Sequence, residues 1–270
     1  MATSERFVCD RVAGIRLRAL HWGNPTAPPL ILLHGGGANA RWWDHIAESF
    51  SRDFHVVALD FRGHGDSDHT EEVRVGAFDD DLDSLIEHLG ARQPILVGHS
   101  MGGHVALDRA SRHPETRALV LLDILGGATP RDKRVARLAL SLRRTYRSRE
   151  EAIARFRFFP PAPGAKASLR RAIGAASVRE EEDGRWGFAF DPRWFGLPAR
   201  KRPELSSIVC PTLLVRGAQS ELLTPDHAQA MVATLPKGQF CEIPDAGHHV
   251  QIEQPQAVVR AIQDFLAPLA

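Results

Sequence analysis

The stretch Ile95-Leu96-Val97-Gly98-His99-Ser100-Met101-Gly102-Gly103 decides how the rest of the chain is interpreted. Its apolar first half is typical of a buried strand, and a helical pattern begins after Ser100, so the stretch predicts a strand, a tight turn and a helix. Ser100 has a glycine two residues before it and another two residues after it, and such small neighbours let a strained turn expose the hydroxyl. We expect Ser100 to be a nucleophile; the alternative is an ordinary serine at a helix N-cap.

Short apolar runs and helical patterns alternate on both sides of this turn. Residues 5–21 predict two antiparallel strands joined near Gly14, and buried strands are expected at 30–33, 55–60, 95–97, 118–122, 212–215 and 239–243. Helical patterns cover 40–50, 75–89, 100–112, 225–234 and 255–266. Strands that alternate with helices at this spacing predict an α/β fold with a mostly parallel central sheet flanked by helices.

The middle of the chain differs from the rest in charge and pattern. Residues 131–202 hold 19 Lys and Arg against 8 Asp and Glu, although the whole chain has a formal net charge of only +1. Helical patterns, with no buried-strand run, fill this region. The sequence therefore predicts a helical cap at 125–207, inserted after the strand that ends at Asp123, between the two parts of a core at 1–124 and 208–270.

The arginine-rich cap has two explanations. Long side chains cover apolar surface while their charged ends stay in water. Alternatively, one or two of them, for example Arg143, Arg144 or Arg157, attract an anionic substrate. Nucleic acid is not expected as a partner, because the positive charge lacks a recognition motif and the remainder of the chain is acidic.

Composition narrows the class of protein further. The chain of 270 residues is 43% hydrophobic, without a run of about 18 apolar residues or a signal-peptide pattern. We therefore expect a cytoplasmic protein that does not bind membranes. The three cysteines, Cys9, Cys210 and Cys241, are far apart, so neither a disulfide framework nor a metal site is expected, and no cofactor is implied. The oligomeric state is left open.

Four motifs, each after a predicted strand, together resemble one family. They are His34-Gly35-Gly36-Gly37, the loop at 60–65, the Ser100 turn and Ala246-Gly247-His248. In this order the chain resembles the α/β-hydrolase superfamily over nearly its whole length, as a serine esterase or lipase with a cap. The resemblance implies the α/β-hydrolase fold and an acyl-enzyme on Ser100. It also implies His248 as general base and an oxyanion hole formed by the backbone N–H groups of Gly36 and Met101.

The third member of the expected triad has two candidates. The family usually places an aspartate three residues past a glycine after the strand at 212–215, but Gly217 is followed there by Ser220, and Glu221 comes one residue later. Other members carry the acid at the end of the strand that follows the helix after the serine turn, which is called the nucleophile elbow, and Asp123 lies there. We prefer Asp123, whose role would be to orient the His248 ring; the alternatives are Glu221 or a plain turn carboxylate at 123.

Three functions fit this pattern. The first is a cofactor-independent serine hydrolase that cleaves a small or medium carboxylic ester, thioester or lactone. The second is a carbon–carbon bond hydrolase of the meta-cleavage product type, which would cleave a dienoate ring-fission product faster than any ester. The third is a ligand receptor or scaffold that keeps the fold without turnover, which would bind a small molecule without releasing product.

Overall fold

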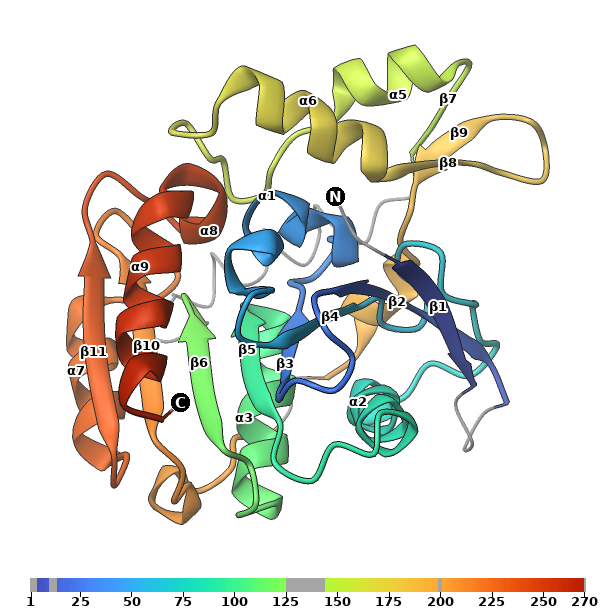
Figure 1. Ribbon diagram of the computed structural model, residues 1–270. Helices are drawn as coiled ribbons and strands as arrows, with labels where there is room; N and C mark the ends of the chain where they lie inside the picture. The colour runs from blue at the N-terminus through green and yellow to red at the C-terminus, as the bar shows by residue number, and fades with distance from the viewer. Residues whose placement is uncertain (1–3, 10–13, 125–143, 199–200, 270) are drawn as a thin grey trace.

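A computed structural model describes residues 4–9, 14–124, 144–198 and 201–269, and its centre is an eight-stranded sheet (Figure 1). The strand order is β1-β2-β4-β3-β5-β6-β10-β11. The bounds of these strands are β1 Ser4–Cys9, β2 Arg16–Trp22, β3 Pro29–Leu33, β4 His55–Leu59, β5 Ile95–His99, β6 Ala118–Leu122, β10 Thr212–Gly217 and β11 Gly238–Ile243.

The sheet is parallel from β4 to β11, and only β1 and β2 are antiparallel to their neighbours. The expected mostly parallel sheet is therefore confirmed. Strands β3 to β6 are apolar along nearly their whole length because layers of helices cover both faces. Since β5, β6 and β10 lie side by side and run in the same direction, the loops after them meet at one edge of the sheet.

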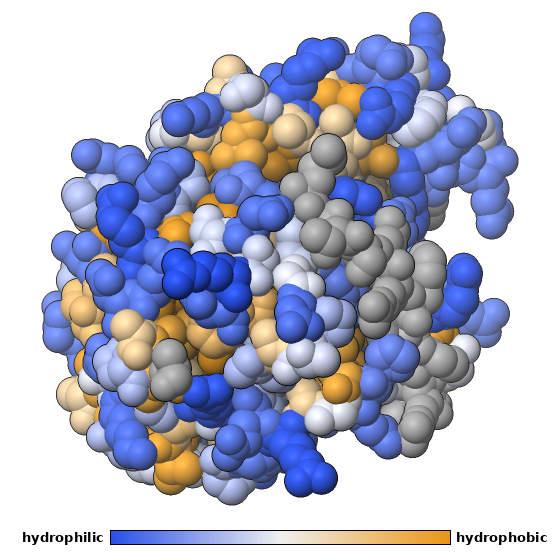
Figure 2. Space-filling model, in the orientation of Figure 1, coloured by the Kyte–Doolittle hydropathy of each residue, from blue (hydrophilic) through white to orange (hydrophobic). Residues whose placement is uncertain are grey.

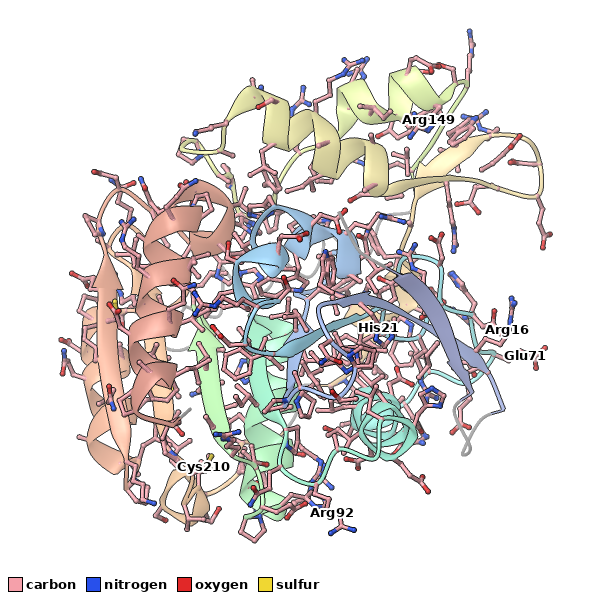
Figure 3. All side chains as sticks on the ribbon, in the orientation of Figure 1. Arg16, His21, Glu71, Arg92, Arg149 and Cys210 are labelled. Carbon is pink, nitrogen blue, oxygen red and sulfur yellow. The ribbon has the colours of Figure 1, made fainter. Side chains whose placement is uncertain are left out.

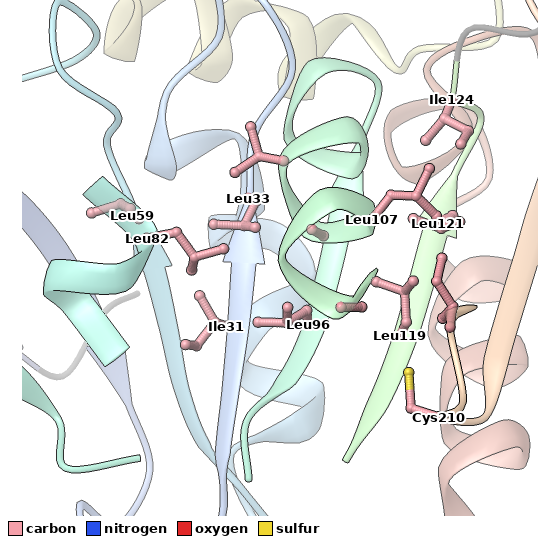
Figure 4. Packing of buried hydrophobic residues seen from close by; sticks show 14 of the residues in the cluster. Ile31, Leu33, Leu59, Leu82, Leu96, Leu107, Leu119, Leu121, Ile124 and Cys210 are labelled. Carbon is pink, nitrogen blue, oxygen red and sulfur yellow. The ribbon is translucent and has the colours of Figure 1, made fainter. Parts of the chain in front are cut away.

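Two layers of helices enclose this sheet. One face packs against α2 (Ala77–His88), α3 (Met101–Arg112) and α7 (Pro225–Thr234), and Figure 4 shows Leu107 of α3 beside Leu121 of β6. The other face packs against α1 (Asp44–Ala47), α8 (Val250–Glu253) and α9 (Pro255–Leu266), whose buried side chains include Val258 and Ile262. This arrangement is the predicted α/β architecture.

The predicted helix at 40–50 is instead three short pieces, η1 (Ala40–Trp43), α1 and η2 (Glu48–Phe50). Side chains take the first N–H groups of this segment: the Arg41 N–H donates to Asn39 and the Ala40 N–H donates to the buried carboxylate of Asp60. The bond to Asp60 holds the start of this segment close to the end of β4, and the turns are of the 3-10 type that is common in short pieces.

The described part of the predicted cap contains both helices and strands. Its helices are α5 (Arg149–Arg155) and α6 (Ala167–Ala176), followed by the turn η3 (Pro192–Gly196). A three-stranded antiparallel sheet, in the order β7-β9-β8, is formed by β7 Thr145–Tyr146, β8 Val178–Glu180 and β9 Trp186–Phe188. The expectation of a purely helical cap missed these strands, because two or three half-exposed residues do not form an apolar run. The boundaries at 125 and 207 stay a prediction, since 125–143 lie outside the described residues.

The cap lies across the carboxyl ends of the parallel strands (Figure 1). An apolar cluster joins it to the core, with Trp42 of η1 packed against Phe156 and Phe158 of the cap. On the face drawn in Figure 2, apolar side chains gather in the upper part of the molecule, where the cap lies. The Trp42 indole N–H also donates to the Ser177 hydroxyl over 2.9 Å, so the contact is both apolar and directional.

None of the described helices is long and apolar enough to cross a membrane. Cys210 and Cys241 are free thiols, and burial raises the pKa of both. Figure 3 shows Cys210 at the end of the molecule opposite the cap, where it belongs to the apolar core beside the sheet.

Candidate active site

Ser100 occupies the turn between β5 and α3, with a backbone φ of 51° and ψ of −115°. This conformation is strained for a residue with a side chain, and the Ser100 N–H is held by the Leu122 carbonyl at 3.1 Å. The flanking glycines are required by close approach: a Cβ on Gly98 would lie 2.5 Å from the Gly102 carbonyl oxygen and from the Gly103 Cα. The G-x-S-x-G spacing is therefore what allows strand and helix to meet here.

His248 lies in the loop after β11, and its ring is hydrogen-bonded to Asp123. Nδ1 of His248 is 2.8 Å from Oδ1 of Asp123, and both side chains are buried. Because a carboxylate only accepts, Nδ1 carries the proton and Nε2 of the neutral ring keeps its lone pair. The structure thus brings Asp123 to His248, whereas Glu221 is exposed.

Asp123 follows β6 and is held by three donors. Its N–H donates to the Val215 carbonyl, which continues the β6–β10 ladder, and its backbone then turns with a φ of 44°. Oδ2 accepts the Gly217 N–H at 2.9 Å, and Oδ1 accepts the Ser220 hydroxyl at 2.6 Å as well as the His248 ring. A fully buried carboxylate with these partners cannot rotate, so it fixes the orientation of the imidazole.

The backbone N–H groups of Gly36 and Met101, the expected oxyanion donors, make none of the turn, loop or cap hydrogen bonds found among the described residues. The glycine loop after β3 touches the elbow, because a Cβ on Gly35 would lie 3.3 Å from the Ser100 Cβ. Met101 is the first residue of α3, so its N–H also carries the positive end of the helix dipole. These donors are suited to hold a negatively charged oxygen next to the serine.

His99 and His249 surround His248. The His99 ring N–H at Nε2 donates to the His248 carbonyl at 3.0 Å, and the two rings are 4.7 Å apart between centroids, which fastens the histidine loop to the elbow. His249 instead donates from Nε2 to the Pro160 carbonyl of the cap at 3.0 Å. Burial lowers the pKa of His99 well below its usual value and that of His249 to about 3, so both rings are neutral.

Glu253 of α8 connects the histidine loop to the cap. Its buried carboxylate accepts the Gly247 N–H at 2.9 Å through Oε2 and the Gly164 N–H at 3.1 Å through Oε1. Gly247 directly precedes His248, while Gly164 belongs to the proline-rich cap segment 160–164. The one carboxylate therefore sets the cap segment and the histidine loop at a fixed separation.

A cavity of about 180 Å³ lies beside His248, between the histidine loop and the cap. Its walls are formed by Gly247, His248, three cap prolines and three polar side chains, namely Pro160, Pro161, Pro163, Gln219, Glu221 and Glu253. A larger hollow of about 340 Å³ lies at the opposite ends of β10 and β11, near Pro211 and Gly238. It is remote from Ser100 and contains none of the candidate site residues.

A family model described as the alpha/beta hydrolase family matches residues 30–261. The chain belongs to this family. Among its relatives, an esterase from Mycobacterium tuberculosis is 29% identical, over 95% of this chain and 88% of the relative. The sn-1-specific diacylglycerol lipase of Mus musculus is 26% identical, over 91% of this chain and 83% of the relative. The crystal structure of E-2-(acetamidomethylene)succinate hydrolase superposes with a TM-score of 0.84 at 22% identity, covering 98% and 99% of the two chains.

The resemblance to esterases and lipases is therefore confirmed, and the protein is a hydrolase of the α/β-hydrolase fold. Three residues at its candidate site were not predicted to contribute to it: His99, Ser220 and Glu253. Ser220 occupies the very position at which an aspartate was expected, and its hydroxyl supports Asp123 instead. His99 directly precedes Ser100, but a histidine at that place gives no signal of a bond to a residue 149 positions later.

Proposed function

We propose that this α/β hydrolase is a serine hydrolase that cleaves small or medium carboxylic esters, thioesters or lactones through an acyl-enzyme on Ser100. The observation that carries the proposal is the hydrogen bond between His248 and the buried, immobilised Asp123 beside the strained Ser100 turn. A serine hydroxyl is a weak nucleophile until a base removes its proton, and an oriented neutral imidazole is such a base.

In the acylation step, the Ser100 oxygen attacks the carbonyl carbon while Nε2 of His248 takes the hydroxyl proton. The carbonyl oxygen becomes an oxyanion, which accepts hydrogen bonds from the Gly36 and Met101 N–H groups. When the tetrahedral intermediate collapses, the bond to the leaving group breaks and the alcohol or thiol departs with the proton from His248. Asp123 stabilises the imidazolium that exists between these two transfers.

In the deacylation step, water attacks the acyl-enzyme and gives a proton to His248. The second tetrahedral intermediate collapses, the ester bond to Ser100 breaks, and His248 returns the proton to the serine oxygen. The products are the carboxylic acid and the free enzyme, so no cofactor or metal ion is required by this sequence of steps.

A panel of p-nitrophenyl esters and lactones tests the reaction, and a fluorophosphonate probe tests the nucleophile. We expect ester hydrolysis, with covalent labelling that mass spectrometry maps to Ser100. Ser100→Ala should lose labelling and about 10⁵- to 10⁶-fold in kcat. Ser111→Ala is the matched control, because Ser111 lies on α3 and its hydroxyl donates to the Asp108 carbonyl. If the purified protein neither hydrolyses any of these substrates nor reacts with the probe, the proposal is wrong.

A further inference from the structure

In the tetrahedral intermediate of the proposed acylation step, the acyl chain and the leaving group extend in different directions from the reacting carbon. The leaving group receives its proton from His248, so it must lie next to that ring. The acyl group is bonded to the same carbon and therefore extends away from His248. Because its carbonyl oxygen would be held by the N–H groups of Gly36 and Met101, residues on the side of the glycine loop lie close to the reacting carbon.

Phe195 of η3 lies on that side. A Cβ on Gly36 would be 2.7 Å from Cε1 and 3.3 Å from Cζ of the Phe195 ring, and 3.9 Å from Sδ of Met101. The edge of the ring is therefore in contact with the backbone of Gly36, one of the two proposed oxyanion donors. Phe195 is not among the residues that line the cavity at His248.

The backbone near Phe195 is anchored to the core. The Asp191 N–H donates to the Gly63 carbonyl at 2.7 Å, and the Gly65 N–H donates to the Ala189 carbonyl at 2.8 Å. The neighbouring Trp194 is buried, with its ring 4.6 Å from that of Phe78 of α2. These contacts hold the backbone of η3 against the core on either side of the half-buried Phe195 ring.

We propose that Phe195 limits the length of the acyl group and makes this enzyme selective for esters of short acids, while bulky leaving groups are accommodated at His248. This inference rests on the proposed serine hydrolase function. A longer acyl chain has to displace a ring whose backbone is anchored, and steric discrimination of one methylene in an enzyme pocket amounts to roughly 10- to 200-fold in kcat/KM.

The test compares wild type with Phe195→Ala and Phe195→Leu on p-nitrophenyl acetate, butyrate and octanoate, which share one leaving group. We expect Phe195→Ala to raise the octanoate-to-acetate ratio of kcat/KM by about 10-fold or more, and Phe195→Leu to raise it less. Phe188→Leu is the matched control, since Phe188 is also a half-buried cap phenylalanine but packs against Tyr146 and Phe156. It should leave the ratio within about 2-fold.

A second series varies the leaving group at constant acetyl, with p-nitrophenyl and 2-naphthyl acetate. We expect the ratio of kcat/KM between these two acetates to be the same in wild type and in both Phe195 variants. An unchanged chain-length ratio in the Phe195 variants, or a change confined to the leaving-group series, overturns the role of Phe195 while the hydrolase function stands. Failure of wild type to hydrolyse any ester or to be labelled at Ser100 instead removes the proposed function itself.

Discussion

The elbow region and the cap are attached to the protein in different ways. The Ser100 and Asp123 loops continue the ladder of the buried sheet, because their N–H groups donate to Leu122 and Val215 of neighbouring strands. The cap contacts the core through an apolar cluster, through hydrogen bonds from Asn39 and Trp42 to residues 176–177, and through the segments at 160–164 and 189–195. The proposed catalytic residues thus lie on the most buried part of the fold, and the cap surface proposed to select a substrate is held by separate contacts at the edge of the core.

Asp123→Asn should have the largest effect on kcat, since it changes the chemistry of a buried residue at the proposed site while nearly keeping its side-chain volume. An amide at 123 no longer favours a proton on Nδ1 of His248, so the ring presents the wrong tautomer to Ser100. We expect kcat to fall about 10⁴-fold, the loss seen for the same change in the serine protease triad. Steady-state kinetics on p-nitrophenyl acetate measures it.

Glu221→Gln is the paired variant, because Glu221 was the other candidate for the acid. It is exposed at the rim of the His248 cavity, so we expect a change of less than about 3-fold in kcat. A larger loss for Glu221→Gln than for Asp123→Asn would reverse the assignment of the acid.

The sequence predicted the central sheet and the loops at its carboxyl edge well. Apolar runs that end in glycine or polar motifs located the strands, and the order of the motifs indicated Ser100, His248 and Asp123 as candidates that the fold does bring to one edge of the sheet. These patterns are informative because parallel strands covered on both faces must be continuously apolar. The choice of Asp123 over Glu221 followed from its position at a strand end.

The cap could be predicted only in outline. Its strands are too short to form an apolar run, and the contact of Phe195 with Gly36 and the bond from Glu253 to Gly164 join segments that are 89 or more positions apart in the sequence. No local period or spacing records such contacts. Of the three arginines considered as substrate contacts, Arg143 lies outside the described residues, and Arg144 and Arg157 are exposed.

Acid should destabilise the site region strongly, because burial keeps several of its histidines neutral. Burial lowers the pKa of His34 to about 4 and those of His64 and His249 to about 3. The unfolded chain binds protons at these histidines near pH 6.5 and the folded chain does not, so stability is full above pH 6.5 and falls as the pH drops toward 3. The free energy of unfolding changes by up to about 1.4 kcal/mol per pH unit for each histidine.

Urea unfolding at several pH values between 4 and 7 measures this slope, and His249→Phe isolates one histidine. We expect the free energy of unfolding of this variant to depend less steeply on pH, by an amount that corresponds to about one fewer proton taken up on unfolding. This holds even if the lost bond to Pro160 lowers its stability at pH 7. His88→Gln, which replaces an exposed histidine on α2, serves as the control. An identical slope for wild type and His249→Phe would show that His249 is not held neutral in the folded protein.

Glu253 links the His248 loop to the cap, so replacing it tests how far the proposed site depends on that link. Glu253→Ala removes the acceptor that the N–H groups of Gly247 and Gly164 share, at a cost of about 1–3 kcal/mol for each group that water does not reach. We expect kcat/KM to fall about 10-fold, because the His248 loop and the cap segment lose their fixed separation. Thermal unfolding and steady-state kinetics measure the two effects.

Glu253→Gln is the matched variant, since its single amide oxygen can accept only one side of the bridge while its NH₂ group faces the other N–H. It should therefore fall between wild type and Glu253→Ala in kcat/KM. If Glu253→Ala loses stability but keeps the wild-type kcat/KM, the carboxylate stabilises the fold without positioning the site.

Replacing Arg144 and Arg157 of the cap should have the smallest effect, because both are exposed and the guanidinium group of Arg157 is engaged within the cap. Nη1 of Arg157 donates to the carbonyl oxygens of Ala154 and Phe156 at 2.8 and 2.6 Å, and Arg149, which Figure 3 shows on the cap, lies 6.0 Å from the Trp186 ring. Exposed charges are also screened beyond about 8 Å at physiological ionic strength. For the double variant Arg144→Gln with Arg157→Gln, we expect the ratio of kcat/KM between p-nitrophenyl hemisuccinate and p-nitrophenyl butyrate to stay within about 2-fold of wild type. A 10-fold fall in this ratio, with a matching loss of the wild-type preference in high salt, would instead mean that the cap recruits anionic substrates through its charge and not only through its shape.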